Sequence, residues 1–369
     1  MKKVLTAAAV AVAFAAPSAM AAEGPSINVY LPLAVMVGDA ENTTANTTQD
    51  RDTLKTGGGS RLMFNWSDSL DNGMTYNAYM SVNLFNFDQA GALASRNSHV
   101  GLAGDFGSIK LGTNEHFFET DAIFDGYGAD WARLTSNVDP DLDGGSGLGY
   151  QVIGLVSQGF VRRDTNSIWW TSNDINGLTV KAAQIFSTDA VAGNAADESG
   201  YQVGFNYAIG GLSIKANMAK YDDVGLGGAG SSAVPTAAEA GDELEGTEFI
   251  FGYDFGAFKT TFMLIDMSHT DTSAQTTTEA NGYAANVTMP VATGRVLLNV
   301  GDLGNQDQGG VVVADSGKSG FDIGYQHDMS ANTYTFIRYT STEQGANFVT
   351  NGGTAQEVDA MMAGIVFSY

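Results

Sequence analysis

Apolar and polar residues alternate one by one along many segments of this chain, and no other feature limits its fold as strongly. In the last ten residues, for example, Met361, Ala363, Ile365 and Phe367 fall on one face of a strand, which ends on the aromatic residue Tyr369. A strand of about ten residues with one apolar face and an aromatic end is typical of a membrane-spanning barrel. A terminal strand of a soluble sheet is the alternative.

The same alternation recurs at 74–84, 201–209 and 212–218. Counting such segments gives about sixteen strands. They start near residues 27, 60, 74, 96, 108, 166, 178, 201, 212, 247, 257, 281, 292, 319, 331 and 357. Short turns such as Asn176-Gly177 alternate with long polar connections, which we place at 38–57, 223–245 and 303–317. The sequence therefore predicts an all-β fold, a transmembrane antiparallel β-barrel.

The first residues have the pattern of a secretory signal. Lys2 and Lys3 precede an apolar run over 4–16, and small residues follow at 19–21. We therefore expect a signal peptide over 1–21 and one barrel domain over 22–369. No later segment is apolar for long enough to form a helix that spans a bilayer, whereas many segments have the pattern of membrane-spanning strands. An exported protein with these features indicates the outer membrane of a Gram-negative cell. An even number of strands would put both termini on the periplasmic side.

The composition of the chain excludes several kinds of chemistry and of partner. The chain has no cysteine, which excludes disulfides and thiolate chemistry, and neither a GxSxG nor an HxxxH motif is present. We therefore expect no enzyme. The formal net charge is −24 and becomes −26 when the two lysines of the signal leave, which argues against nucleic acid as a partner. The acidity fits either a cation-attracting pore or adaptation to salt.

Several motifs together resemble the general porins of Gram-negative outer membranes, over most of the mature length. Ser60-Arg61-Leu62 leads into an apolar strand, and the run RNSHVGLAGDFG at 96–107 continues as SIKLG. Segments 163–168 and 176–180 resemble the strand pair after the constriction loop of that family. The resemblance implies a sixteen-stranded homotrimer in lipid and lipopolysaccharide, whose long third loop folds into the lumen.

That loop is expected at 116–164. Aromatic residues within it need somewhere to be buried, and the lumen of a wide barrel offers the space. By the resemblance, wall bases face loop acids across the pore. Arg61, Arg96 and Arg163 match basic wall positions, whereas Thr113 and Trp169 replace two arginines that are usual there. The expected basic wall is Arg61, Arg96, His99, Arg162 and Arg163, and the expected loop acids are Glu119, Asp121, Asp125 and Asp130.

For each candidate a plainer interpretation exists. Arg61 could be a solvated lumen residue, and Arg162 and Arg163 a solvated loop pair. Asp139, Asp141 and Asp143 occupy the first positions of a calcium loop, but Tyr150 stands where a bidentate Glu is required, so an acidic turn is the alternative to a weak Ca²⁺ site. We expect no other cofactor.

The function expected from all these features is passive diffusion of small hydrophilic solutes and ions through a water-filled channel that prefers cations. Residues 115–164 hold nine acids and three bases, which supports this preference. A substrate-selective channel, for sugars for example, is one alternative. A structural or adhesive barrel with a plugged lumen is the other.

Overall fold

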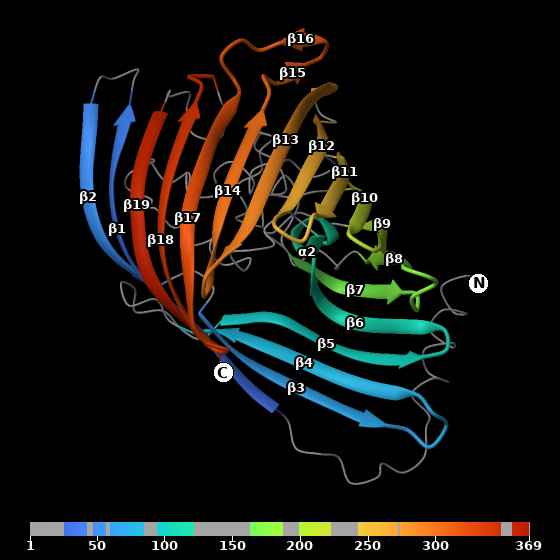
Figure 1. Cartoon of the computed structure of the whole chain (residues 1–369). Helices are drawn as coiled ribbons and strands as arrows, with labels where there is room; N and C mark the ends of the chain where they lie inside the picture. The colour runs from blue at the N-terminus through green and yellow to red at the C-terminus, as the bar shows by residue number, and fades with distance from the viewer. Residues whose placement is uncertain are drawn as a thin grey trace.

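The computed structural model describes residues 26–42, 47–56, 60–84, 94–121, 163–186, 199–222, 243–271, 274–347 and 356–368. Their strands form one antiparallel sheet that closes on itself (Figure 1). Closure is made by β1 (Ser26–Asn42) and β19 (Gln356–Ser368), which pair over thirteen positions, from Tyr30 opposite Ser368 to Asn42 opposite Gln356. The predicted pairing of the last strand with 27–36 is confirmed.

Between them the strands follow one another around the barrel in chain order. They are β2 (Thr47–Thr56), β3 (Arg61–Ser69), β4 (Thr75–Asn83), β5 (Ala94–Gly104), β6 (Gly107–Glu115), β7 (Arg163–Thr171), β8 (Leu178–Ile185), β9 (Ser199–Ile209), β10 (Leu212–Asp222), β11 (Glu243–Asp254), β12 (Lys259–Asp271), β13 (Thr276–Val291), β14 (Gly294–Leu303), β15 (Asp307–Gln308), β16 (Val311–Val312), β17 (Lys318–Ser330) and β18 (Thr333–Gln344).

The predicted count of sixteen agrees with this barrel. β2 and β3 both pair with β1, at 33–42 and 26–30 respectively, so they count as two parts of one barrel strand. The two-residue strands β15 and β16 form a small hairpin that pairs with β13 through Thr278 and Glu279. With these taken into account, the described residues form a closed barrel of sixteen strands.

Two connections expected to be loops contain strands. Most of 38–57 belongs to β1 and β2, and 303–317 contains the β15–β16 hairpin. Residues 47–56, TTQDRDTLKT, are polar at almost every position, so apolar alternation could not identify this strand. Both segments lie at the end of the barrel with long connections.

Side chains separate into two faces as strand geometry requires. On β9, Val203 is 43% exposed and points outward, whereas its neighbour Gln202 is fully buried and points inward. Outward apolar residues occur on many other strands, for example Ile27, Leu264 and Ile323. The outside is thus an apolar surface and the interior is mixed, with many amides and charged groups.

The short turns lie together at one end. Asn176 and Gly177 both have positive φ, 55° and 90°, which is the backbone of a tight hairpin turn. A Cβ at Gly177 would lie 2.1 Å from the carbonyl oxygen of Ala208, so a side chain there would collide with β9. Ser368 donates its backbone N–H to Asn332 in another short turn, which places the end of β19 at this same end of the barrel.

A short helix, α2 (Phe117–Asp121), lies inside the barrel (Figure 1). Phe117 and Phe118 belong to a buried cluster with Trp169, Ile185 and Tyr221. Among the described residues, no helix is long and apolar enough to cross a membrane. The loop expected at 116–164 ends earlier than predicted, because Arg163 and Asp164 already belong to β7. Most of that loop, and the signal segment 1–21, lie outside the described residues.

Candidate functional site in the barrel interior

The start of α2 is held to the barrel wall by a chain of hydrogen bonds. Phe117 donates its backbone N–H to Gln202 Oε1 at 2.9 Å. Gln202 in turn donates through Nε2 to Asp164 Oδ2, and the Tyr221 hydroxyl donates to Asp164 Oδ1 at 2.8 Å. Asp164 is only 2% exposed. Because each of these groups is buried, the network fixes where the chain leaves β6 and enters the interior.

Aromatic contacts support the same segment. The Phe117 ring meets Trp169 edge-on, with centroids 4.6 Å apart and planes at 85°, a favourable arrangement for two rings. Lys181 places Nζ 4.4 Å from the centroid of Phe117. Trp169 donates its indole N–H to Ser167 Oγ at 2.7 Å. The helix is therefore packed against β7 and β8 by both apolar and cation–π contacts.

His116 lies fully inside this packing, between the rings of Phe118 and Tyr221, at 5.0 and 5.6 Å between centroids. Its Nδ1 accepts the backbone N–H of Phe118 at 3.1 Å. Burial, and secondarily the nearby Lys181 ammonium, lower the pKa of the imidazole well below its usual value. His116 is thus neutral near pH 7 while α2 is in place.

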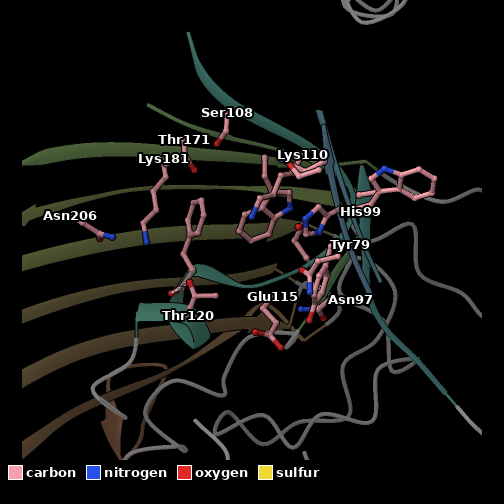
Figure 2. A pocket seen from close by; sticks show the side chains of 18 residues that line it. Tyr79, Asn97, His99, Ser108, Lys110, Glu115, Thr120, Thr171, Lys181 and Asn206 are labelled. Carbon is pink, nitrogen blue, oxygen red and sulfur yellow. Dashed lines mark hydrogen bonds between the residues drawn. The ribbon is translucent and has the colours of Figure 1, made fainter. Parts of the chain in front are cut away.

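A cavity of about 670 Å³ lies between α2 and the inner face of β3 to β9. Figure 2 shows Lys181 and Asn206 extending into it on one side, with Tyr79, His99 and Lys110 gathered on the other. The rings of Tyr79 and His99 are stacked, 5.4 Å apart with 28° between planes. Five asparagines line the cavity: Asn65, Asn77, Asn97, Asn114 and Asn206.

A polar ladder runs across another part of the inner wall, from β13 to β18. Asn286 Nδ2 donates to Asn299 Oδ1 at 2.5 Å, and Asn299 Nδ2 donates to Asp322 Oδ1 at 2.9 Å. The last member is Arg338, whose guanidinium donates to Asp322 Oδ2 at 2.7 Å. Both side chains of this ion pair are buried. The charge of Arg338 is therefore balanced locally.

The structure places two side chains of the predicted site. Arg61 points inward from β3, with its guanidinium carbon 5.2 Å from the centroid of the Tyr30 ring. His99 lines the cavity, whereas Arg61 is outside the set of lining residues. For Arg96, Glu119, Asp121 and Arg163 the backbone is described but the side chain is not. Arg162, Asp125, Asp130 and the three aspartates Asp139, Asp141 and Asp143 lie outside the described residues.

Inward lysines were missed by the sequence analysis. Lys110 on β6 and Lys181 on β8 line the cavity, and Lys110 lies directly opposite Trp169 in the sheet. Successive residues of a strand point to opposite faces, and the neighbours Leu111 and Val180 are apolar and belong on the outer face. This alternation could have identified both lysines as inward-facing. A base thus lies directly opposite Trp169, one of the two positions where the resemblance indicated a lost arginine. No group of three or more metal-ligating side chains is present among the described residues.

Comparisons with known proteins agree with this geometry. Residues 7–347 match the model of a family described as Gram-negative porin. Over 241 residues the chain is 28% identical to a monosaccharide porin of Halomonas sp. and, equally, to the major outer membrane protein of Halomonas elongata. These alignments cover 60% of this chain and 60% of each relative, so the chain spans less than two thirds of the curated relatives it matches.

Solved structures share the fold. An anion-selective porin from Comamonas acidovorans superimposes with a TM-score of 0.66 at 18% identity, covering 94% of this chain and all of that one. The trimer form of OmpT from Vibrio cholerae gives 0.66 at 12% identity over the same shares. The family match extends over most of the strands of the closed barrel. The chain therefore belongs to the Gram-negative porin family and is a protein of the outer membrane.

Proposed function

We propose that this protein is a water-filled channel through which small hydrophilic solutes and ions diffuse passively across the outer membrane. The observation that carries the proposal is the closed barrel with an apolar outside and an interior that contains many amides and charged groups. Such a wall is stable in lipid and leaves an interior suited to water. Family membership supports the same activity, which is transport rather than catalysis.

The proposed mechanism is selection by size and charge. The chain that follows β6 turns inward at His116 and is fixed to β7, β9 and β10, so it occupies part of the interior beside the cavity. We infer that the remainder of 116–164 narrows the pore further, as the family resemblance implies. The wall bases Arg61, Arg96, His99, Arg162 and Arg163, with Glu119, Asp121, Asp125 and Asp130, are the proposed charges at that narrowing.

Conductance in planar bilayers tests this proposal. The purified protein should give stepwise, voltage-independent increases in conductance in KCl, and liposomes that contain it should swell in small sugars or amino acids. A folded protein that gives neither signal would contradict the channel and favour the structural or adhesive alternative.

We further propose that the channel prefers cations over anions. The acid excess at 115–164 supports it, but most of those acids lie outside the described residues. Against it, Lys110, Lys181 and Lys215 project inward from the wall. Reversal potential across a salt gradient decides between the two, since a potential of the anion sign would reject the preference. A weak Ca²⁺ site at Asp139, Asp141 and Asp143 also stays a prediction.

We also propose a homotrimer, as OmpT has in its trimer form. The outer face near β1, β3 and β4 offers apolar residues, among them Ile27, Val35, Trp66 and Met80. One part of this face would meet neighbouring subunits and the rest would meet lipid and lipopolysaccharide. Native mass spectrometry in mild detergent should give three times the mass of the mature chain. A monomer with intact conductance would contradict the trimer.

A further inference from the structure

Three inward lysines occupy the same position in three strands. Lys110, Lys181 and Lys215 are each the fourth residue of their strand, on β6, β8 and β10 respectively. Each follows a glycine of a short turn, and the residues between are alike: GSIK at 107–110, GLTVK at 177–181 and GLSIK at 211–215. Because the short turns share one end of the barrel, the three lysines lie at a similar height, about 10 Å along the strand from that end. We call these three residues the lysine arc.

The members of the lysine arc differ in exposure although their sequence setting is the same. Lys110 is exposed and Lys215 is half-buried, whereas Lys181 is only 6% exposed. The position in the strand does not explain the burial of Lys181, since the equivalent positions on β6 and β10 leave the side chain accessible. The difference therefore arises from what lies over the Lys181 side chain.

Phe117, at the start of α2, covers Lys181. The ammonium nitrogen lies 4.4 Å from the centroid of the Phe117 ring, and Figure 2 shows Lys181 pointing from the wall toward α2, on which Thr120 is labelled. The ring is held in turn by the edge-on contact with Trp169, and the backbone of Phe117 is held by Gln202. The cover over Lys181 is therefore anchored to the barrel wall at two points.

On its other side Lys181 lies near a buried acid. Its stem passes over Gly204, where a Cβ would lie 3.0 Å from Lys181 Cε. The same row of the sheet continues from Gly204 through Asn217 to Glu248. Asn217 donates to Glu248 Oε1 at 2.8 Å, and Glu248 is only 2% exposed and close enough to attract Lys181. The positive charge of Lys181 thus lies between an aromatic ring and a carboxylate.

A lysine placed in this way acts weakly on ions that pass through the lumen. The Phe117 ring keeps water and anions from contacting the ammonium, and Glu248 offsets its charge at a distance. An accessible lysine such as Lys110, in contrast, attracts anions over about a Debye length, about 8 Å at physiological salt. Removing the ring would let Lys181 turn into the lumen water, because its flexible stem is long and its ammonium is strongly hydrated there.

We propose that Phe117 determines part of the charge selectivity of the channel, because its ring caps the middle lysine of the lysine arc and so lowers the attraction of the lumen for anions. The inference rests on the proposed channel and adds to it a residue that acts through another one. Lys181 carries the charge, and Phe117 positions and covers it. While α2 is docked against β7 and β8 the lumen attracts anions less, and release of α2 makes it attract them more.

Chemical reactivity tests the cap directly. The folded protein in detergent micelles is treated with a water-soluble reagent that acylates amines, and the modification of each lysine is followed by mass spectrometry. Lys181 should react about tenfold more slowly than Lys110, the factor that corresponds to one desolvated cation–π contact. In Phe117→Ala the two rates should become similar. Phe249→Ala is the matched control, because Phe249 is 43% exposed on the outer face, and it should leave the difference in place.

The reversal potential in a KCl gradient tests the effect on ions. Phe117→Ala should lower the permeability ratio of K⁺ to Cl⁻ about twofold at low salt, the bias expected from one more accessible charge near the pore axis. Lys181→Gln should raise this ratio only slightly in the unmodified protein but about twofold in the Phe117→Ala background. Lys110→Gln is the matched comparison, because it should raise the ratio equally in both backgrounds. Tyr221→Phe, which loosens α2 through a different contact, should act in the same direction as Phe117→Ala.

Slow acylation of Lys181 that is lost in Phe117→Ala, together with an effect of Lys181→Gln that depends on the background, supports the proposal. Equal acylation of Lys181 and Lys110 in the unmodified protein overturns it. An unchanged permeability ratio in Phe117→Ala also overturns it, and so does an effect of Lys181→Gln that is the same in both backgrounds. These results leave the channel function intact, whereas absence of any conductance from the folded, unmodified protein contradicts the channel itself and removes the basis of the inference. If Phe117→Ala does not fold, Tyr221→Phe replaces it in both measurements.

Discussion

Tyr221 on β10 donates its hydroxyl hydrogen bond to Asp164 on β7, 2.8 Å away, across the two strands that lie between them in the sheet. Tyr221 is fully buried. The contact joins three separate strands to the beginning of α2, since Gln202 on β9 also donates to Asp164 and accepts from Phe117. The position of the inward segment therefore depends on one carboxylate.

Replacing Tyr221 by Phe should loosen α2 without opening the barrel. Loss of one buried hydrogen bond to a charged acceptor should cost about 1.5–3 kcal/mol of local stability. The expected result is faster hydrogen exchange at the Phe117 and Phe118 amides and faster proteolysis between 116 and 163. Tyr283→Phe is the control, because Tyr283 is 45% exposed on the outer face. Equal rates in the two variants would contradict the anchoring role.

The buried pair of Arg338 and Asp322 should be more sensitive than an exposed one. Arg338→Met leaves the Asp322 carboxylate buried, with Asn299 as its one side-chain donor among the described residues, and breaking such a pair typically costs about 3–5 kcal/mol. Lys220→Met is the control, because Lys220 pairs with Glu243 and Glu245 outside the lumen, where an exposed pair is worth about 0–1 kcal/mol. Urea denaturation, followed by gel mobility, measures the stability of the two variants. An equal loss of stability in Arg338→Met and Lys220→Met would contradict this prediction.

Selectivity should respond to the lysines of the wall. Lys110→Met removes a positive charge from the cavity, so the reversal potential in a KCl gradient should shift toward cations, and Arg61→Met should shift it in the same direction. Charges act over about 8 Å at physiological salt and about 3 Å at 1 M, so the shift should shrink as salt rises. Lys220→Met, on the outer face, should cause no shift. Neutralising Asp121 and Asp125 together should act in the opposite direction, and no change in any of these variants would refute the charge roles.

The position of α2 should depend on pH through His116. Its pKa is lowered in the docked segment and returns toward about 6.5 when the segment opens, so the open form binds the proton more strongly. The docked form is therefore most stable above about pH 6.5 and loses stability as pH falls below it. The protection factor of the Phe118 amide should drop between pH 7.5 and pH 5. In His116→Asn this dependence should disappear, whereas His327→Asn should keep it; an unchanged protection factor in the unmodified protein would contradict the prediction.

Much of the barrel could be predicted because its strands repeat one local rule. The predicted and observed first residues of the strands agree within about five residues, from Ser26 near 27 to Gln356 near 357. They agree because each strand carries its own alternation of apolar and polar residues. The rule failed at β2, where both faces are polar, and at α2, whose five residues carry no helical period. Short turns such as Asn176-Gly177 were recognised because positive φ restricts which residues fit.

The candidate site could be predicted only in part. Alternation along the strands puts His99 and Lys110 on the inner face, because their neighbours Val100 and Leu111 are apolar and belong on the outer face. The Asp164 network could not be foreseen, because it joins β7, β9 and β10 through side chains that no sequence spacing relates. The cavity likewise could not be foreseen, because its lining residues come from seven successive strands, β3 to β9, and from α2.

Closure by β1 and β19 has a consequence for assembly. The thirteen pairs between them join positions at opposite ends of the described chain, so they form the most non-local contact in the fold. Contacts of that kind are slow to form, because the entropy of closing a very long loop is lost before any pairing energy is gained. Until then, both strands expose free hydrogen-bonding edges that can pair with other chains. The time spent as an open sheet, rather than the stability of the finished barrel, should set how easily this protein aggregates during its biogenesis.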